Sequence, residues 1–307
     1  MIVVIAGIVL ILYPYISEYF FENRVDSEIM AYKECINKTV DQQYQRMLEQ
    51  AEEYNSYLQK SQMQLTDPFA NTGGTEEQPA YESLLRVDDS GIIGYVEIPT
   101  IGVKLPVYQG TSAGDLERGV GHLKGSSLPV GGKGTHSGLT GQTGLSQAKL
   151  LSDLTEMKEG DVFYIYVLGR QLAYEVYATS VVLPEDTEQL RIEKDKDLVT
   201  IVTCTPYGIN THRLFVHGKR IPFSEPQYQK ELSKTPVTLN SRWRSAYGRA
   251  LLAGGMFAVC LIVLLVLDIR KIIGVTLVII GCITFMSPEI VQEYYQIRTK
   301  ATLKMYD

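Results

Sequence analysis

Residues 198–213 read Leu198-Val-Thr-Ile-Val-Thr-Cys204-Thr-Pro-Tyr-Gly-Ile-Asn-Thr-His-Arg213. The apolar, β-branched run before Cys204 is typical of a buried strand. The Pro and Gly that follow predict a turn, and Arg213 begins a second expected strand at residues 213–219. A thiol at a strand end is presented rather than buried, and a guanidinium beside it can stabilise a thiolate or an oxyanion. The stretch therefore predicts a reactive cysteine carried on a sheet.

Short strands are also expected upstream of this hairpin, separated by Gly, Pro and Asp turns. They lie at residues 92–98, 103–108, 162–167 and 172–179, and the hairpin itself adds the strand at 198–204. Little helix fits between them, except near residues 147–154. This spacing predicts a closed or sandwiched antiparallel β domain.

The region before the strands has a different periodicity. Between residues 25 and 60, apolar side chains recur at steps of three and four, with no Gly or Pro. The pattern predicts an amphipathic helix or helix pair, which needs a partner surface. We expect it to pack against the β domain that follows.

Three apolar runs lie near the ends of the chain. Residues 2–16 begin at the start methionine and lack a small-residue cleavage pattern, which favours an uncleaved anchor. Residues 250–267 are long enough to span a bilayer, and residues 272–286 form a second span or a re-entrant piece. Arg270 and Lys271 favour a cytoplasmic turn, but Arg242, Arg244 and Arg249 lie on the other side of the span, so its orientation stays open.

Charge and cysteine content exclude several functions. The net charge of −6 offers no basic surface for nucleic acid. Four scattered cysteines form neither a disulfide framework nor a metal cluster, and without a Cys-x-x-Cys pair a thiol oxidoreductase is disfavoured. No metal and no cofactor is implied.

Thr200-Ile-Val-Thr-Cys204 resembles the Thr-Leu-x-Thr-Cys signature of the sortase family. In that family the cysteine is the nucleophile and an arginine nine residues later is its partner, as Arg213 is here. The resemblance implies an eight-stranded β-barrel and cleavage of LPxTG-like sorting signals through a thioester. It also implies substrate contacts by Thr203 and Thr205.

A second stretch, residues 134–150, also resembles the family but departs from it at one position. Gln142 stands where the resemblance places the catalytic histidine. An amine leaves a tetrahedral intermediate only when protonated, and imidazole can supply that proton whereas an amide cannot titrate near neutrality. Three explanations stay open: an engineered change, a naturally weak or inactive protein, or a shifted register.

The four histidines offer no obvious replacement. His136 would lie about 20 Å from Gln142 along an extended segment, and His217 about 13 Å from Arg213. His212 would point to the opposite face from Arg213. His122 lies in a Gly-rich loop. We expect each to be a structural or surface histidine.

Asp67-Pro68-Phe69 matches the Asp-Pro-aromatic lid motif of class C sortases, which polymerise pilins. The resemblance implies that Asp67 contacts the arginine and that Phe69 lies near the cysteine. With the C-terminal membrane segments, the motif favours class C over a housekeeping or class B sortase.

The predicted protein is mainly β: a closed eight-stranded sortase-type barrel with an N-terminal helical extension and transmembrane segments at both ends. The predicted boundaries are an anchor at 1–18, a helical extension at 19–65, a lid at 66–80, the barrel at 81–225, a linker at 226–249, a transmembrane helix at 250–267, a second hydrophobic segment at 272–286 and a tail at 287–307.

The expected function is a membrane-anchored class C transpeptidase, impaired by Gln142, that joins pilin subunits through lysine. Its expected partners are pilin or surface proteins with LPxTG-like signals and the membrane. Its expected place is the cell membrane of a Gram-positive type bacterium, with the catalytic domain extracytoplasmic. The alternatives are a sortase-like binder or pilus-assembly scaffold without turnover, and a housekeeping enzyme that anchors proteins to the cell wall.

Overall fold

The computed structural model describes residues 2–61, 81–143, 150–206 and 209–237, with side chains from Tyr13 onward except residues 14 and 15. The helices are α1 (Ile2–Lys38), α2 (Asp41–Ser61), α3 (Ala113–Arg118) and α4 (Glu225–Leu232), with short 3-10 turns η1 (Tyr81–Ser83), η2 (Pro99–Ile101), η3 (Ser152–Glu156) and η4 (Glu188–Leu190). The strands are β1 (Ile92–Ile98), β2 (Val103–Gln109), β3 (Val120–His122), β4 (Thr135–Thr140), β5 (Val162–Val167), β6 (Arg170–Val182), β7 (Asp197–Thr205) and β8 (His212–Ile221).

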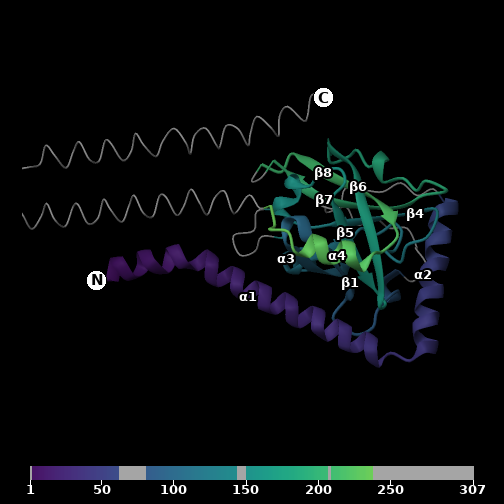
Figure 1. Ribbon diagram of the computed structural model, residues 1–307, viewed down its shortest axis with the longest axis horizontal. Coiled ribbons are helices and arrows are strands. Elements are labelled where there is room, and N and C mark those ends of the chain that lie inside the picture. The colour runs from purple at the N-terminus through teal and green to yellow at the C-terminus, as the bar shows by residue number, and fades with distance from the viewer. Residues whose placement is uncertain (1, 62–80, 144–149, 207–208, 238–307) are drawn as a thin grey trace, which may run out of the picture. The chain divides into compact units, whose positions relative to one another are not determined.

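The eight strands form one closed barrel in the order β1-β2-β3-β4-β7-β8-β6-β5, and β5 pairs with β1 to complete it (Figure 1). The predicted closed, mainly β barrel is therefore confirmed. The prediction that its strands are antiparallel is wrong at two places, because β2 pairs with β3 and β4 pairs with β7 in parallel. Parallel neighbours need a crossover connection, and α3 supplies one between β2 and β3.

The predicted strands at 92–98 and 162–167 match β1 and β5, and the other four differ from the observed strands only at their ends. Two strands, β3 and β4, were not predicted. Both lie in the Gly-rich stretch 119–141, where every strand residue is buried, so no alternation of apolar and polar residues marks them.

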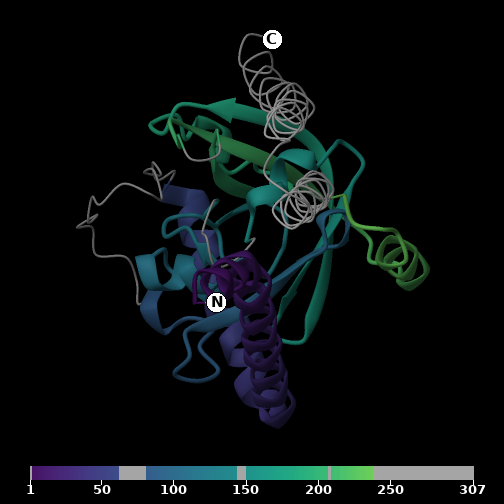
Figure 2. The ribbon, with the colours of Figure 1, turned by 90° about the vertical axis from the view of Figure 1, so that its left-hand side faces the viewer.

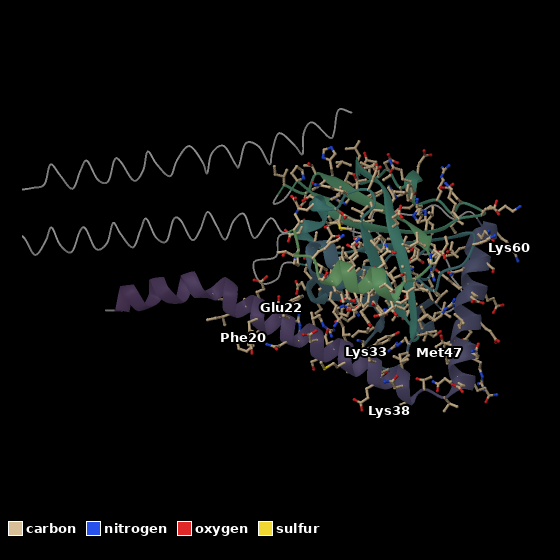
Figure 3. All side chains as sticks on the ribbon, in the orientation of Figure 1. Phe20, Glu22, Lys33, Lys38, Met47 and Lys60 are labelled. Carbon is tan, nitrogen blue, oxygen red and sulfur yellow. The ribbon has the colours of Figure 1, made fainter. Side chains whose placement is uncertain are left out.

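The N-terminal helical region is a pair of helices that break at Thr39 and Val40. The hydroxyl of Thr39 donates to Cys35 O at 2.8 Å, which satisfies a carbonyl at the end of α1. Asp41 then begins α2, where a carboxylate is favoured by the helix dipole. Figures 1 and 2 show the two helices meeting at an angle beside the barrel, and Figure 3 labels Lys38 at that corner.

Both helices pack against the barrel, as predicted. Val25, Ile29 and Tyr32 of α1 are buried in the main hydrophobic cluster. The hydroxyl of Tyr32 donates to Ile93 O and accepts from Leu168 N, both at 3.0 Å. On α2, the Asn55 amide donates to Leu128 O at 3.1 Å and accepts from Leu128 N at 2.7 Å. The extension is therefore fixed to the barrel by buried polar contacts as well as by apolar packing.

Beyond the barrel, α4 begins where a linker was predicted. Its Tyr228 packs edge-to-face on Tyr164 of β5, with ring centroids 4.9 Å apart. Among the helices that the structure describes, none is long and apolar enough to cross a membrane. The predicted spans at 250–267 and 272–286, and the tail at 287–307, lie outside the described residues.

Candidate active site

Cys204 and Arg213 lie opposite each other at the loop end of the β7–β8 hairpin. The antiparallel ladder pairs Thr203 with Leu214, Cys204 with Arg213 and Thr205 with His212. Opposed residues in such a ladder have Cβ atoms about 4.5–5.5 Å apart. The half-buried thiol and the arginine therefore share one face of the hairpin, as predicted from the sequence.

Gln142 lies beside Cys204 on the other side. Strand β4 runs parallel to β7 in a register that pairs Thr140 with Val202, so that two residues further on position 142 is level with Cys204. The pairing persists beyond the strand, because Gly141 N donates to Val202 O at 3.1 Å and Thr143 Oγ1 donates to Cys204 O at 3.1 Å. Adjacent strands lie about 4.8 Å apart, so residues 142, 204 and 213 form one row across three strands.

Gly141 leaves room for the buried side chain of Leu151 to pack against this segment. A Cβ atom at position 141 would lie 2.7 Å from Leu151 Cδ1, closer than real Cβ contacts allow. Leu151 N in turn donates to Gln142 O at 3.3 Å. The backbone of Gln142 is thus held on one side by β7 and on the other by the turn that leads to η3.

Arg213 is buried, and its side chain folds back towards the β7–β8 connection. Its Nη1 donates to Asn210 O at 3.1 Å and to His212 O at 3.2 Å. Asn210 adopts a left-handed backbone with φ of 60°, a conformation that asparagine tolerates better than most residues. The loop therefore positions the guanidinium at the Cys204 end of the hairpin, where its positive charge can stabilise a thiolate or an oxyanion.

The two threonines beside the cysteine are buried. Thr203 Oγ1 donates to Gly141 O at 2.8 Å, which fastens the end of β4 to β7. Thr205 is 7% exposed. That these two threonines contact the substrate stays a prediction. The hydrogen bond of Thr203 to Gly141 O holds the residue next to Gln142 against β7. Thr143 was missed by sequence reasoning, although its place in Thr-Gly-Gln-Thr-Gly put it next to the position of interest.

Three of the four histidines are buried and hydrogen-bonded within the barrel wall. His122 lies on β3, with Nδ1 2.8 Å from Tyr81 Oη and Nε2 2.9 Å from Ser127 O. Burial lowers the pKa of His122 to about 4. This imidazole is neutral near pH 7 and already has its partners.

His136 and His217 are similarly placed. Burial lowers the pKa of His136, and burial followed by the charge of His136 lowers the pKa of His217 to about 4. His136 lies on β4, so the segment between it and Gln142 is extended, which was the condition for the predicted separation of about 20 Å. His212 lies on β8 beside Thr211, with which it shares a 2.9 Å contact. None of these four takes the position beside Cys204 that Gln142 occupies.

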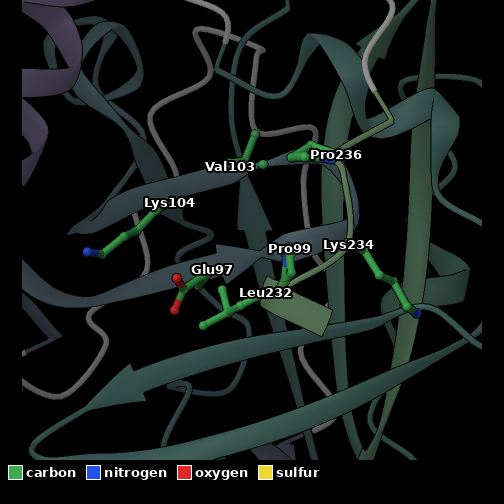
Figure 4. Close-up of a pocket in the computed structure, with 8 residues that line it drawn as sticks. Glu97, Pro99, Val103, Lys104, Leu232, Lys234 and Pro236 are labelled. Carbon is green, nitrogen blue, oxygen red and sulfur yellow. The ribbon is translucent and has the colours of Figure 1, made fainter. Parts of the chain in front are cut away.

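A hollow of about 220 Å³ lies elsewhere, at the junction of β1, η2 and β2 with the segment that follows α4 (Figure 4). Its lining includes Glu97, Lys104, Leu232 and Pro236, and no residue of the row at Cys204. This hollow is therefore separate from the candidate active site. The predicted lid residues Asp67, Pro68 and Phe69 lie outside the described residues.

Comparison with known proteins agrees with this geometry. The family model of the sortase domain matches residues 96–221. Sortase C-1 from Actinomyces oris is 46% identical, and the match covers 59% of this chain and 99% of that chain, with a TM-score of 0.55. The chain belongs to the sortase family. Sortases are cysteine transpeptidases.

Two further solved structures place this sortase among class C members. Sortase C1 of Streptococcus agalactiae is 40% identical over 66% of this chain and 99% of that chain, with a TM-score of 0.60. Sortase C of Streptococcus pneumoniae, whose structure was described for its catalysis and pilin substrate specificity, is 40% identical over 65% of this chain and 99% of that chain, with a TM-score of 0.58. These matches extend beyond the barrel that the family model covers.

Proposed function

We propose that this sortase is a membrane-anchored class C transpeptidase that joins pilin subunits, and that Gln142 impairs it. Sortases act on LPxTG-type surface proteins and pilins, and they are membrane-associated in Gram-positive bacteria. The single observation that carries the proposal is the row formed by residues 142, 204 and 213. The similarity to class C structures at 40–46% identity supports the pilin assignment.

In the proposed reaction, the Cys204 thiolate attacks the carbonyl carbon of threonine in the Thr–Gly bond. The negative charge that develops on the carbonyl oxygen is stabilised by the Arg213 guanidinium. The intermediate then collapses to a thioester, and the glycine nitrogen leaves as an amine after it gains a proton. A lysine amine of the next subunit attacks the thioester, loses a proton and regenerates the thiolate.

Two of these steps require a group that gives and takes a proton. An imidazole level with Cys204 would do so, whereas the Gln142 amide donates a hydrogen bond without releasing the proton. General acid–base catalysis contributes roughly 10²- to 10⁴-fold in rate. We therefore propose that thiolate attack survives in this chain and that release of the amine is slow.

The second candidate is a sorting-signal binder or pilus-assembly scaffold that does not turn over. Gln142 is the observation that favours it, because the buried histidines cannot replace an imidazole at this position. A housekeeping role in cell-wall anchoring is a further alternative, which the similarity to class C structures disfavours.

The test is covalent capture by the full chain in detergent micelles. We expect incubation with a Leu-Pro-x-Thr-Gly peptide to give a mass adduct on Cys204, and Cys204→Ala to abolish it. Cys35→Ala is the matched control, since Cys35 is a partly buried thiol on α1, where its Sγ contacts Asp88. An adduct that persists in Cys204→Ala would refute the nucleophile assignment.

A further inference from the structure

The row of residues at the reactive cysteine extends over four strands. Gln142 follows β4, Cys204 lies on β7, Arg213 lies on β8, and Val182 of β6 is paired with Arg213. The side chains on either side of the thiol are therefore an amide, a permanently charged guanidinium and an isopropyl group. None of these three groups gives up or takes a proton near neutral pH. Within this row, Cys204 has no proton carrier beside it.

Two imidazoles lie on the same strands as the row but are held away from it. Thr200 and His217 are paired in the β7–β8 ladder, four residues from Cys204 and Arg213, which is about 13 Å along the strands. The Thr200 hydroxyl lies 2.7 Å from His136 Nε2 and 2.8 Å from His217 Nδ1. The second nitrogen of each ring also has a partner within 3.0 Å. Both imidazoles are thus fixed in a hydrogen-bonded chain that does not extend to Cys204.

The absence of a proton carrier from the row affects substrates differently, according to the group that must leave. An amine leaves a tetrahedral intermediate only after its nitrogen has gained a proton, which is the step that an imidazole assists. A thiol leaves as its thiolate without a proton, since an ordinary thiol has a pKa of about 8.5. The composition of the row therefore slows cleavage of a peptide bond but does not impede exchange of an acyl group between two thiols.

We propose that Cys204 accepts the acyl group of a sorting signal from a thioester, so that this chain carries the group from one thiol to another. The chemical class of substrate is a thioester of the threonine carboxyl group in a Leu-Pro-x-Thr segment. A reaction that converts the peptide bond of the sorting signal into a thioester must supply this substrate. The inference rests on the proposed function, because it uses the same thiol and the same acyl group.

The exchange balances without moving a proton. The Cys204 thiolate attacks the thioester carbonyl carbon and forms a new carbon–sulfur bond, and the oxyanion that results is stabilised by the positive charge of Arg213. Collapse of this intermediate breaks the original carbon–sulfur bond, and the bonding electron pair departs with the leaving sulfur as a thiolate. One thiolate is consumed and one is released. The acyl group then remains on Cys204.

The same argument predicts that the acyl group stays on Cys204 until another thiolate removes it. Attack by water or by a lysine ammonium group requires a base that takes up a proton, and the row supplies none. Attack by a thiolate requires no base. The acylated chain is therefore expected to be long-lived in the absence of thiols, which is the property that a carrier needs.

The experiment compares two substrates that carry the same acyl group, the Leu-Pro-x-Thr-Gly peptide and the mercaptoacetate thioester of Leu-Pro-x-Thr. Mass spectrometry follows acylation of Cys204 in the full chain in detergent, and the measured quantity is the rate with thioester divided by the rate with peptide. We expect this ratio to be at least about 10²-fold larger than in Gln142→His, because the imidazole assists departure of the amine. Lys219→His, which adds an imidazole at an exposed position of β8, should keep the ratio of the unaltered chain. Equal ratios in the chain and in Gln142→His would overturn the proposal.

Cys35 shows whether the exchange is specific to the row. It is also a half-buried thiol, but burial, followed by its contact with Asp88, raises the pKa of Cys35, whereas Cys204 is paired with an arginine. Because the thiolate is the nucleophile, we expect the thioester to acylate Cys204 at least about tenfold faster than Cys35 in the same sample. Equal acylation of the two thiols would mean ordinary thiol exchange and would overturn the carrier.

The lifetime of the acylated chain gives a second measurement. After removal of free thiol, the Cys204 adduct of the chain should persist at least about 10²-fold longer than that of Gln142→His, and equal lifetimes would contradict the carrier. The results also separate this inference from the proposed function. Turnover of the peptide by Gln142→His, without acylation of the unaltered chain by the thioester, would overturn the carrier alone. Absence of any Cys204 adduct from either substrate in both proteins would contradict the proposed function as well.

Discussion

Cys204 and Arg213 are directly opposed in the β7–β8 ladder, and a loop of the same hairpin turns the guanidinium back towards the strand ends. The pair is therefore built by local structure, with few long-range contacts needed to bring the two side chains together. This local origin explains why the sequence spacing alone could predict the pairing.

Replacement of Arg213 by lysine should slow the attack of the Cys204 thiolate on the sorting peptide. Arg213→Lys keeps the charge but loses the planar fork that donates to Asn210 O and His212 O. We expect adduct formation on Cys204 to fall by roughly 10²-fold, the scale of losing one oxyanion donor. Rapid mixing with the sorting peptide followed by mass spectrometry measures the rate. Lys219→Arg, an exposed change on the same strand, is the control, and an unaltered rate in Arg213→Lys would remove the arginine from the mechanism.

A lid formed by the Asp67-Pro68-Phe69 motif should restrict access to the thiol. Asp67→Ala is expected to raise the rate at which iodoacetamide labels Cys204, because the proposed contact with Arg213 would be lost. The measurement is site-resolved labelling of the full chain by mass spectrometry, with Cys35 as an internal reference. Labelling at an unchanged or lower rate would count against gating by this motif.

The attachment of α2 to the barrel should depend on Asn55. Its side chain is 4% exposed and satisfies both backbone groups of Leu128. Asn55→Leu leaves a buried donor and acceptor without partners, which costs about 1–3 kcal/mol for each group. Chemical denaturation followed by circular dichroism would give the loss, and the exposed Gln50→Leu on the same helix should cost little. A neutral Asn55→Leu would show that α2 is held by apolar contacts alone.

Acid should destabilise the barrel through its buried histidines. The pKa of His122 is about 4 in the fold and about 6.5 in the unfolded chain, so the unfolded chain binds the extra proton first as pH falls. The stabilisation is complete above pH of about 6.5 and is lost towards pH 4, by roughly 3 kcal/mol for this one group. His122→Gln should reduce that loss. Because carboxylates titrate in both proteins, the difference between their free energies of unfolding from pH 7 to pH 4 isolates His122, and identical pH curves would contradict the assignment.

The sequence supports prediction best where one segment determines its own structure. Strands β1 and β5 are regular apolar runs bounded by turns, and their ends match the prediction. Strands β3 and β4 were not predicted because they lie in a glycine-rich stretch and all of their residues are buried, so no alternation of apolar and polar residues marks them. The same two strands create the parallel pairings, so the topology could not be derived from local pattern alone.

The site shows the same division. The pairing of Cys204 with Arg213 could be predicted from their spacing in the sequence because both lie in one hairpin. By contrast, Gln142 is level with Cys204 through a pairing between strands that are some sixty residues apart, for which only the resemblance to sortases gave a clue. The linkage of His136, Thr200 and His217 could not be foreseen, since it depends on the register of three strands at once.

The central claim is that this chain has the sortase site except for its proton-transfer group, and Gln142→His tests it most directly. The full chain and this variant are incubated with a Leu-Pro-x-Thr-Gly peptide and an amine acceptor, and the adduct and the released product are followed by mass spectrometry. We predict that the histidine variant turns over at least about 10²-fold faster than the chain as given. Equal turnover by the two proteins would contradict the account, because another group would then supply the proton.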